Sequence, residues 1–116
     1  MRMNVFEMEG FLRGKCVPRD LKVNETNAEY LVRKFDEVRA EARNEGINYT
    51  ASRLAAAFNH GFINKPLAEV FDVTRMILSA KEDLANESHP IDGLSGEYAE
   101  KSLEEWAERL RKGGSQ

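Results

Sequence analysis

Cys16 is the side chain best suited to covalent chemistry, because a thiolate is a strong nucleophile. Arg13 and Arg19 lie near it in the sequence, and cationic neighbours stabilise thiolates. A cysteine nucleophile also needs a base, and neither His60 nor His89 is close to Cys16 in the chain. We therefore expect Cys16 to be structural, and we predict no catalytic residue.

A metal site is not expected either. The two histidines, His60 and His89, have no ligand partner three or four residues away, whereas zinc needs about four clustered ligands. The segment from Gly10 to Gly14 lacks the Lys-Ser/Thr ending of a phosphate-binding loop. Carboxylate pairs such as Glu104-Glu105 fit solvated helix faces. The sequence thus predicts a protein that is not an enzyme and has no cofactor.

The composition is that of one soluble globular domain. The chain has 116 residues, of which 41% are hydrophobic and 32% charged, and this length fits a single domain, residues 1–116. A single cysteine excludes an intrachain disulfide and favours a reducing compartment. No apolar run approaches the ~20 residues of a membrane span, and no signal peptide is evident. We expect a cytoplasmic protein that has no membrane partner.

The charge distribution argues against nonspecific binding to nucleic acid, which normally requires a basic surplus. The net charge is −3, and residues 82–116 carry nine acidic and four basic side chains, a net charge of −5. Such an acidic end can repel nucleic acid or engage a basic partner. The simpler interpretation is a solvated helix face.

Two helices are predicted in the first half of the chain. Thr26 and Glu29 have the spacing of a capping box, and the apolar residues that follow recur with a helical period up to Ala42, which predicts a stripe that faces the core. Gly46 is expected to end this helix, which gives residues 27–44. A second helix is expected after Thr50, running to about residue 60 with Leu54, Ala55 and Phe58 buried. Gly61 would end it.

Two more helices are predicted in the second half. Asn64 is a suitable N-cap for the third, with Pro66 in its first turn, and the His89-Pro90 pair follows its end. Ser95 is expected to cap a fourth helix that reaches about residue 112, with Trp106 in its apolar stripe. The sequence therefore predicts a mainly all-α fold, a compact bundle of about four helices over residues 26–112. Residues 113–116 should be a disordered tail.

The N-terminal arm, residues 1–25, leaves two alternatives. Val5, Phe6, Phe11 and Leu12 fit a short helix broken by glycines. They also fit a short pair of strands, because two further apolar segments follow. Pro18 biases the preceding residue towards an extended backbone, so a turn is expected there.

Residues 67–78 form one motif with a possible functional meaning. They resemble the core of a helix-turn-helix DNA-binding unit, with Ala68 as the small residue at the helix crossing and Asp72 at the turn. The resemblance implies burial of Phe71, Val73 and Leu78. It implies DNA binding by the following residues: Thr74, Arg75 and Lys81. The motif departs from the family pattern because an aspartate replaces the turn glycine and acidic residues follow Lys81. An uninterrupted amphipathic helix explains the same residues.

Protein binding is the function that the sequence favours. We expect a small module that binds and modulates or inhibits a larger bacterial protein or nucleoprotein machine, of phage or mobile-element origin. The expected contact residues are apolar and lie in the arm and in the turn after Gly61: Phe6, Phe11, Phe62 and Ile63. The alternative is a helix-turn-helix-like transcriptional regulator that binds DNA. The sequence does not identify the partner or the oligomeric state.

Overall fold

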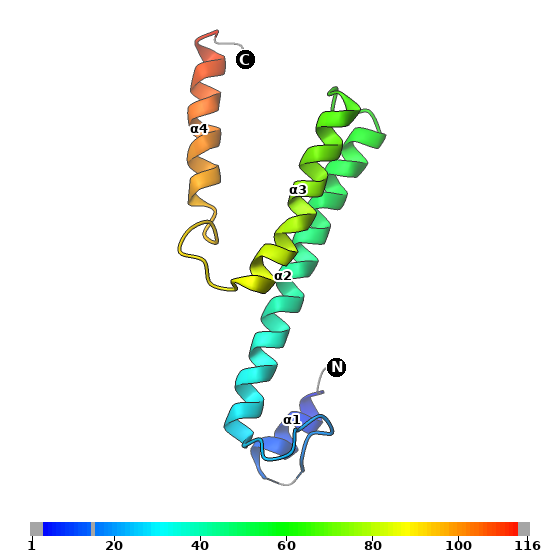
Figure 1. Cartoon of the computed structure of the whole chain (residues 1–116), viewed down its shortest axis with the longest axis vertical. Helices are drawn as coiled ribbons and strands as arrows, with labels where there is room; N and C mark the ends of the chain where they lie inside the picture. The colour runs from blue at the N-terminus through cyan, green and yellow to red at the C-terminus, as the bar shows by residue number, and fades with distance from the viewer. Residues whose placement is uncertain (1–3, 15, 114–116) are drawn as a thin grey trace. The chain divides into compact units, whose positions relative to one another are not determined.

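The computed structural model describes residues 4–14 and 16–113, which form four α-helices and no strand. The helices are α1 (Val5–Leu12), α2 (Asn27–Asn59), α3 (Leu67–Asn86) and α4 (Glu97–Arg111) (Figure 1). The prediction of an all-α fold is confirmed. The chain divides into two units, Met1–Glu45 and Gly46–Gln116, so that α2 contributes to both.

The N-terminal arm is helical, and the expected alternative of a strand pair is wrong for its described residues. A capping box begins α1: the Asn4 side chain accepts from the Glu7 backbone N–H at 2.7 Å, and the Glu7 carboxylate accepts from the Asn4 N–H at 3.2 Å. Gly10 lies inside α1 and does not break it. Gly14, with φ of +74°, follows the end of the helix. The start of the arm, residues 1–3, and residue 15 lie outside the described residues.

Helix α2 is continuous where the sequence predicted two helices, so the expected break between Gly46 and Thr50 is wrong. Gly46 has an ordinary helical backbone, because it is absent from the residues with positive φ. The Thr50 hydroxyl donates to the Gly46 carbonyl at 2.9 Å, one helical turn back, and does not cap a new helix. Glycine permits a left-handed stop without requiring one, and a helix interior tolerates it at a cost of about 1 kcal/mol.

The end of α2 was predicted correctly at Gly61, and its geometry explains why. Gly61 has φ of +81°. Its N–H donates to the Phe58 carbonyl at 3.1 Å, and the Phe62 N–H donates to the Ala57 carbonyl at 2.8 Å. These two bonds form a Schellman motif, which satisfies carbonyls that the last helical turn leaves unpaired. The chain then turns into α3.

Helix α3 lies beside the second half of α2 (Figure 1). Val70 on α3 and Ala51 on α2 are buried, and the Lys81 ammonium donates to the Asn48 side chain at 2.6 Å. The N-cap of α3 is Pro66 with no side-chain bond, so the expected N-cap at Asn64 is wrong. Pro66 fits at that position because its missing N–H would have had no intrahelical partner.

The helix-turn-helix resemblance does not hold in the structure. Asp72, the expected turn residue, lies within an uninterrupted α3, where its carboxylate pairs with Arg75 at 3.5 Å. Phe71 and Val73 are 60% and 42% exposed, although the resemblance implied that both are buried. The simpler interpretation, a single amphipathic helix, is the correct one.

The N-cap of helix α4 lies one residue after the predicted cap. The N-cap is Gly96 with φ of +82°, and the Ser95 hydroxyl accepts from the Glu97 N–H at 3.3 Å. No residue of α4 is buried, so Trp106, expected in the core, is about half exposed. Gly113 follows α4, and residues 114–116 of the expected tail lie outside the described residues.

The expected compact bundle requires correction, because few apolar side chains are buried. Among the described residues, the buried hydrophobic ones are Phe11 and Tyr30 in the first unit and Ala51 and Val70 in the second. Within each unit, the apolar stripes read from the sequence are therefore largely exposed. Within the described ranges, every helix is too short or too polar to cross a membrane.

Candidate functional site

Tyr30 is the centre of the first unit and connects its apolar and polar contacts. The side chain is 1% exposed, and its ring meets the Phe11 ring edge-on, with centroids 5.5 Å apart. Its hydroxyl donates to an Asp20 carboxylate oxygen at 2.9 Å. One residue thus joins α1, the loop before α2, and α2.

Arg33 lies one turn after Tyr30 and ties the same loop to α2. Its Nε and Nη2 donate to the two carboxylate oxygens of Glu25 at 2.9 and 3.0 Å, a bidentate pair. Nη2 also donates to the Asp20 backbone carbonyl at 2.8 Å, and Nη1 donates to Glu37 at 3.1 Å. The guanidinium carbon lies 5.2 Å from the centre of the Tyr30 ring, so a cation–π contact adds to these bonds.

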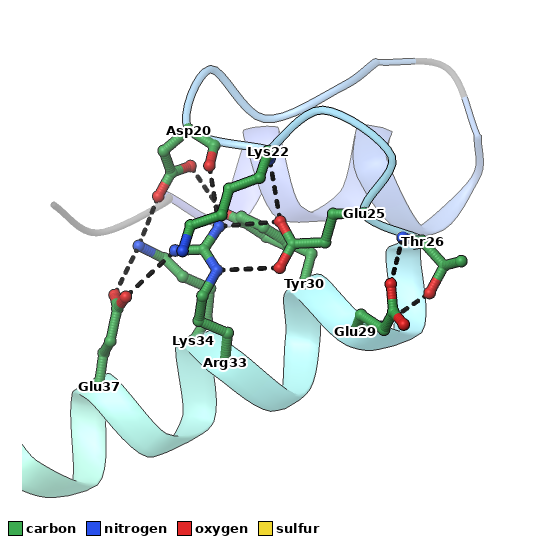
Figure 2. Close-up of polar contacts among 9 residues, drawn as sticks. All are labelled: Asp20, Lys22, Glu25, Thr26, Glu29, Tyr30, Arg33, Lys34 and Glu37. Atoms are coloured by element: carbon green, nitrogen blue, oxygen red, sulfur yellow. Dashed lines mark hydrogen bonds and ion pairs between the residues drawn. The ribbon is translucent and has the colours of Figure 1, made fainter.

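Lys34 completes the arrangement, which Figure 2 shows. Its ammonium donates to Asp20 at 2.6 Å and to Glu37 at 3.0 Å, and lies 5.8 Å from the Tyr30 ring centre. We call the following residues the polar cluster: Asp20, Glu25, Tyr30, Arg33, Lys34 and Glu37. Its members come from the loop and from one face of α2. The bonds between loop and helix members connect residues that are eight to fourteen positions apart in the sequence.

The loop that carries Asp20 and Glu25 is shaped by its own hydrogen bonds. The Glu25 N–H donates to the Lys22 carbonyl at 3.0 Å, and the Glu25 carboxylate accepts from the Lys22 N–H at 3.0 Å. Asn24 takes the left-handed backbone of this turn, with φ of +67°. The predicted capping box follows and is confirmed, with reciprocal bonds of 2.9 and 3.0 Å between Thr26 and Glu29.

The acidic members of the polar cluster are held in their ionised forms. Hydrogen bonds from Lys34 and then Tyr30 lower the pKa of Asp20 from 3.8 to about 2. The Arg33 side chain and then the Lys22 N–H lower the pKa of Glu25 from 4.5 to about 2. The pKa of Glu37 is lowered, mainly by its hydrogen bond from Lys34.

The pKa values of the other members are also shifted away from neutral pH. The pKa of Arg33 is raised by its bond to Glu25, and that of Lys34 by its bond to Asp20. The pKa of Tyr30 is raised by burial and then by its bond to Asp20. Each shift moves the pKa of its group further from 7, so the members of the cluster keep their charge states near that pH. Its chemistry is suited to holding a shape rather than to acid–base catalysis.

The opposite face of α2 carries an apolar stripe that is exposed. We define the α2 stripe as the apolar residues whose helical spacing predicted burial: Ala28, Leu31, Val32, Phe35, Val38 and Ala42. Val32, Phe35 and Val38 are 60%, 68% and 52% exposed and Leu31 is half-buried, so the predicted burial of this stripe is wrong for most of its residues. At about 100° per residue, Tyr30, Arg33 and Glu37 project from the side opposite to the stripe, where α1 and the loop pack. Lys34 lies between that side and the edge of the stripe.

A shallow hollow borders the α2 stripe along the first half of the helix. Its apolar lining comes from Ala28, Val32 and Ala40, and its polar lining from Glu29, Arg33, Asp36 and Glu37. The hollow therefore connects the α2 stripe with the edge of the polar cluster. It has the character of an open surface and not of an enclosed substrate pocket.

The four residues predicted to contact a partner are divided between the units. Phe6 and Phe62 are 82% and 84% exposed, Ile63 is half-buried, and Phe11 is only 3% exposed. The side chain of Phe11 therefore serves the interior of the first unit. Phe6 belongs to the first unit, and Phe62 and Ile63 belong to the second. Contact of Phe6, Phe62 and Ile63 with a partner stays a prediction.

The residues expected to read DNA do not form a basic surface in α3. The Thr74 hydroxyl is buried without a hydrogen-bond partner, and the Lys81 ammonium is engaged by Asn48. Arg75 is exposed but pairs with Asp72 and lies over the Phe71 ring, with its guanidinium carbon 5.4 Å from the centroid. The three side chains therefore do not form a row that could contact successive phosphates.

Cys16 is exposed, and its thiol contacts α1. Its Sγ lies 3.6 Å from the Glu7 carbonyl, and a Cβ added at Gly10 would come within 2.8 Å of the same sulfur atom. The glycine thus leaves room for this thiol beside the helix. In the described part of the chain, no group of three or more His, Cys, Asp and Glu side chains is placed to hold a metal ion.

The segment that contains the polar cluster is similar in sequence to known proteins. The family described as the YfdS protein N-terminal domain matches residues 4–45, and the first structural unit also ends at residue 45. The YfdS protein of Escherichia coli K12 is 90% identical over 41 residues, which cover 35% of this chain and 34% of that protein. No solved structure matches the chain.

A second relative extends the similarity beyond the first unit. The Eae protein of Salmonella phage P22 is 36% identical over 77 residues, which cover 66% of this chain and 46% of that protein. The chain is thus related to a phage protein, which confirms the expected phage association. It spans about a third of the length of YfdS and just under half of the length of the Eae protein.

Proposed function

We propose that this chain is a non-enzymatic protein-binding module that modulates a larger bacterial protein, and that α4 is the helix it presents to that partner. The observation that supports the proposal is the exposure of the apolar face of α4. Leu103, Trp106 and Leu110 follow one another at spacings of three and four residues and are 62%, 51% and 70% exposed. Anchors at this spacing are typical of a helix that binds in an apolar groove.

The charge of α4 defines the kind of groove that it fits. Five glutamates accompany the apolar face, against three basic residues, and residues 82–116 carry a net charge of −5. A partner groove edged with lysine and arginine would complement this helix and accelerate association. Trp106 is the expected central anchor, because tryptophan is enriched among residues that dominate binding energy.

The first unit contributes a rigid support in this proposal. The polar cluster joins three segments of chain through charge-assisted bonds and contains no group that titrates near pH 7. A regulator or inhibitor acts by occupying a surface of its target and needs no catalytic group of its own. The relation to a phage protein agrees with a role in which the target belongs to the bacterial host.

Direct binding to a purified target tests the proposal. Tagged protein would capture candidates from nuclease-treated bacterial lysate, and each candidate would then be purified and titrated calorimetrically. Trp106→Ala should weaken binding roughly thirtyfold, about 2 kcal/mol. Lys101→Ala, on the charged side of the same helix, is the matched control and should leave the affinity within about twofold.

Two results would contradict the proposal. One is a purified complex whose affinity is unchanged by Trp106→Ala and by Leu103→Ala. The other is a strongly blue-shifted Trp106 fluorescence in the isolated protein, because it would mean that α4 already packs against its own chain. Phe6→Ala and Phe62→Ala test the contact residues predicted from the sequence in the same titration.

A further inference from the structure

We propose that the α2 stripe is a self-association surface, at which two copies of this chain pair as a short antiparallel coiled coil. This inference is independent of the function proposed for α4. It starts from the spacing of five members of the stripe, which alternates between three and four residues: Ala28, Leu31, Phe35, Val38 and Ala42. This is the a/d pattern of a heptad repeat, with the first, third and fifth residues at a and the others at d.

Four of the five seam residues are exposed and Leu31 is half-buried, so the intramolecular contacts of the first unit leave most of the seam available. Tyr30 and Glu37 occupy heptad position c and Arg33 occupies position f, which point away from an a/d seam. Val32, at position e, extends the apolar surface on one side of the seam and is 60% exposed. A second helix can therefore pack on α2 without displacing the polar cluster.

Charge complementarity selects a second copy as the occupant and sets its direction. Lys34 and Glu41 are the g positions of the stripe, and g faces g in an antiparallel pair. Lys34 of one copy then lies opposite Glu41 of the other, twice by symmetry. In a parallel pair, g faces e, and Lys34 would lie opposite the like-charged Arg39.

The pairing register follows from the same positions. An antiparallel pair that places Phe35 beside Val38 of the second copy also places Leu31 beside Ala42, so a large side chain meets a small one in each outer layer. Lys34 already donates to Asp20 and Glu37, and an ammonium has a third donor for Glu41 of the second copy. The same face of α2 is thus used by both copies, as in an isologous interface.

Mass measurement of the full chain in solution is the first test. Light scattering or sedimentation over a range of concentrations should show a reversible dimer. Phe35→Glu should raise the dimer dissociation constant roughly a hundredfold or more, since it places a charge in the two central layers. Ala40→Glu, at the outward f position of the same helix, should leave the constant unchanged.

A wild-type chain that stays monomeric throughout would overturn the proposal. A dimer that resists Phe35→Glu, or one dissociated equally by Ala40→Glu, would do the same. A dimer that dissociates on Trp106→Ala would also overturn it, and would place self-association on α4. Circular dichroism of each variant confirms that its helices are retained.

A distance measurement tests the direction without disturbing the seam. In a Cys16→Ser background, spin labels would be attached to Asn44→Cys, an exposed position outside the seam. In the antiparallel register, residue 44 lies level with residue 29 of the second copy, so the two labels are separated by roughly 22 Å along the axis. In a parallel pair they are level, about 10 Å apart across the axes. The short distance would overturn the antiparallel assignment.

Discussion

The Tyr30 hydroxyl donates to Asp20 at 2.9 Å, which connects the buried ring of α2 to the charged loop ten residues earlier. The same ring packs edge-on against Phe11 on its other side. Tyr30 therefore couples an apolar contact to a network of ion pairs.

Tyr30→Phe isolates the contribution of the hydroxyl. The ring contact with Phe11 is kept, the bond to Asp20 is lost, and the first unit should be destabilised by about 1 kcal/mol. Hydrogen exchange should show faster opening of α1 and the loop, with the amides of α3 as an internal reference. Tyr49→Phe is the matched control on the same helix, because Tyr49 is 65% exposed, and it should change nothing.

Phe11→Ala tests the apolar half of the same arrangement. Loss of a buried phenylalanine should destabilise the first unit by about 3 kcal/mol and release the Tyr30 ring from its edge-on contact. Phe6→Ala removes an identical side chain from the same helix where it is 82% exposed, and should stay within about 0.5 kcal/mol. Chemical denaturation followed by the tyrosine spectrum would compare them. Equal effects would contradict the assignment of Phe11 to the interior.

The pH dependence of the first unit follows from its lowered carboxylate pKa values. The pKa of Glu25 is about 2 in the folded chain against 4.5 ordinarily, and that of Asp20 is about 2 against 3.8. A lowered folded-state pKa gives stability that is present above the ordinary value and lost as the pH falls towards the folded value. The first unit should therefore lose stability between about pH 4.5 and pH 2, as NMR spectra recorded across this range would show.

Glu25→Gln identifies the origin of that acid sensitivity. The variant should be less stable at pH 7 because Arg33 loses its bidentate partner, and its stability should vary less across the acidic window. Glu104→Gln, in the solvent-facing part of α4, is the control. An unchanged acid profile in the Glu25 variant would show that other carboxylates govern the transition.

Gly46→Ala distinguishes one continuous helix from two. The backbone of Gly46 is helical and a Cβ there would meet nothing within 4 Å, so alanine should stabilise the second unit by about 0.5–1 kcal/mol. Gly61→Ala is the contrasting change, because φ is +81° at Gly61 and alanine there should cost about 1 kcal/mol. Thermal denaturation should show a higher melting temperature for Gly46→Ala and a lower one for Gly61→Ala. Destabilisation by Gly46→Ala would mean that α2 breaks at this point.

Thr74→Val tests the buried hydroxyl on α3. Valine has nearly the same shape and removes a polar atom that has no hydrogen-bond partner, so the second unit should become more stable by about 1 kcal/mol. Thr74→Ala is the control for packing and should destabilise, since it leaves a cavity. Loss of stability in both variants would show that the hydroxyl has a partner.

Local signals allowed correct prediction of the helical class and of several helix ends. The Thr26 and Glu29 capping box and the Gly61 stop depend on residues within one turn of each other, and both were predicted. The capping box of Asn4 and Glu7 has the same kind of spacing and was missed. Gly46 and Thr50 were misjudged because a glycine and a threonine fit both a helix interior and a helix boundary.

The polar cluster could not be predicted from the sequence in the same way. The bonds of Arg33 to Glu25 and of Lys34 to Asp20 depend on how the preceding loop folds back on α2, and no fixed spacing encodes that path. The apolar residues of α2 were assigned to the core because helical periodicity identifies a face without stating what covers it. The structure places α1 and the loop on the opposite, charged face.

The first unit has a consequence for the order of folding. The ring contact between Phe11 and Tyr30 spans nineteen residues, and the ion pair between Asp20 and Lys34 spans fourteen. Contacts between residues so close in the chain require little loop closure and form rapidly. Residues up to Glu45 can therefore fold before α3 has emerged from the ribosome, and the rest of α2 then elongates from a helix that is already nucleated.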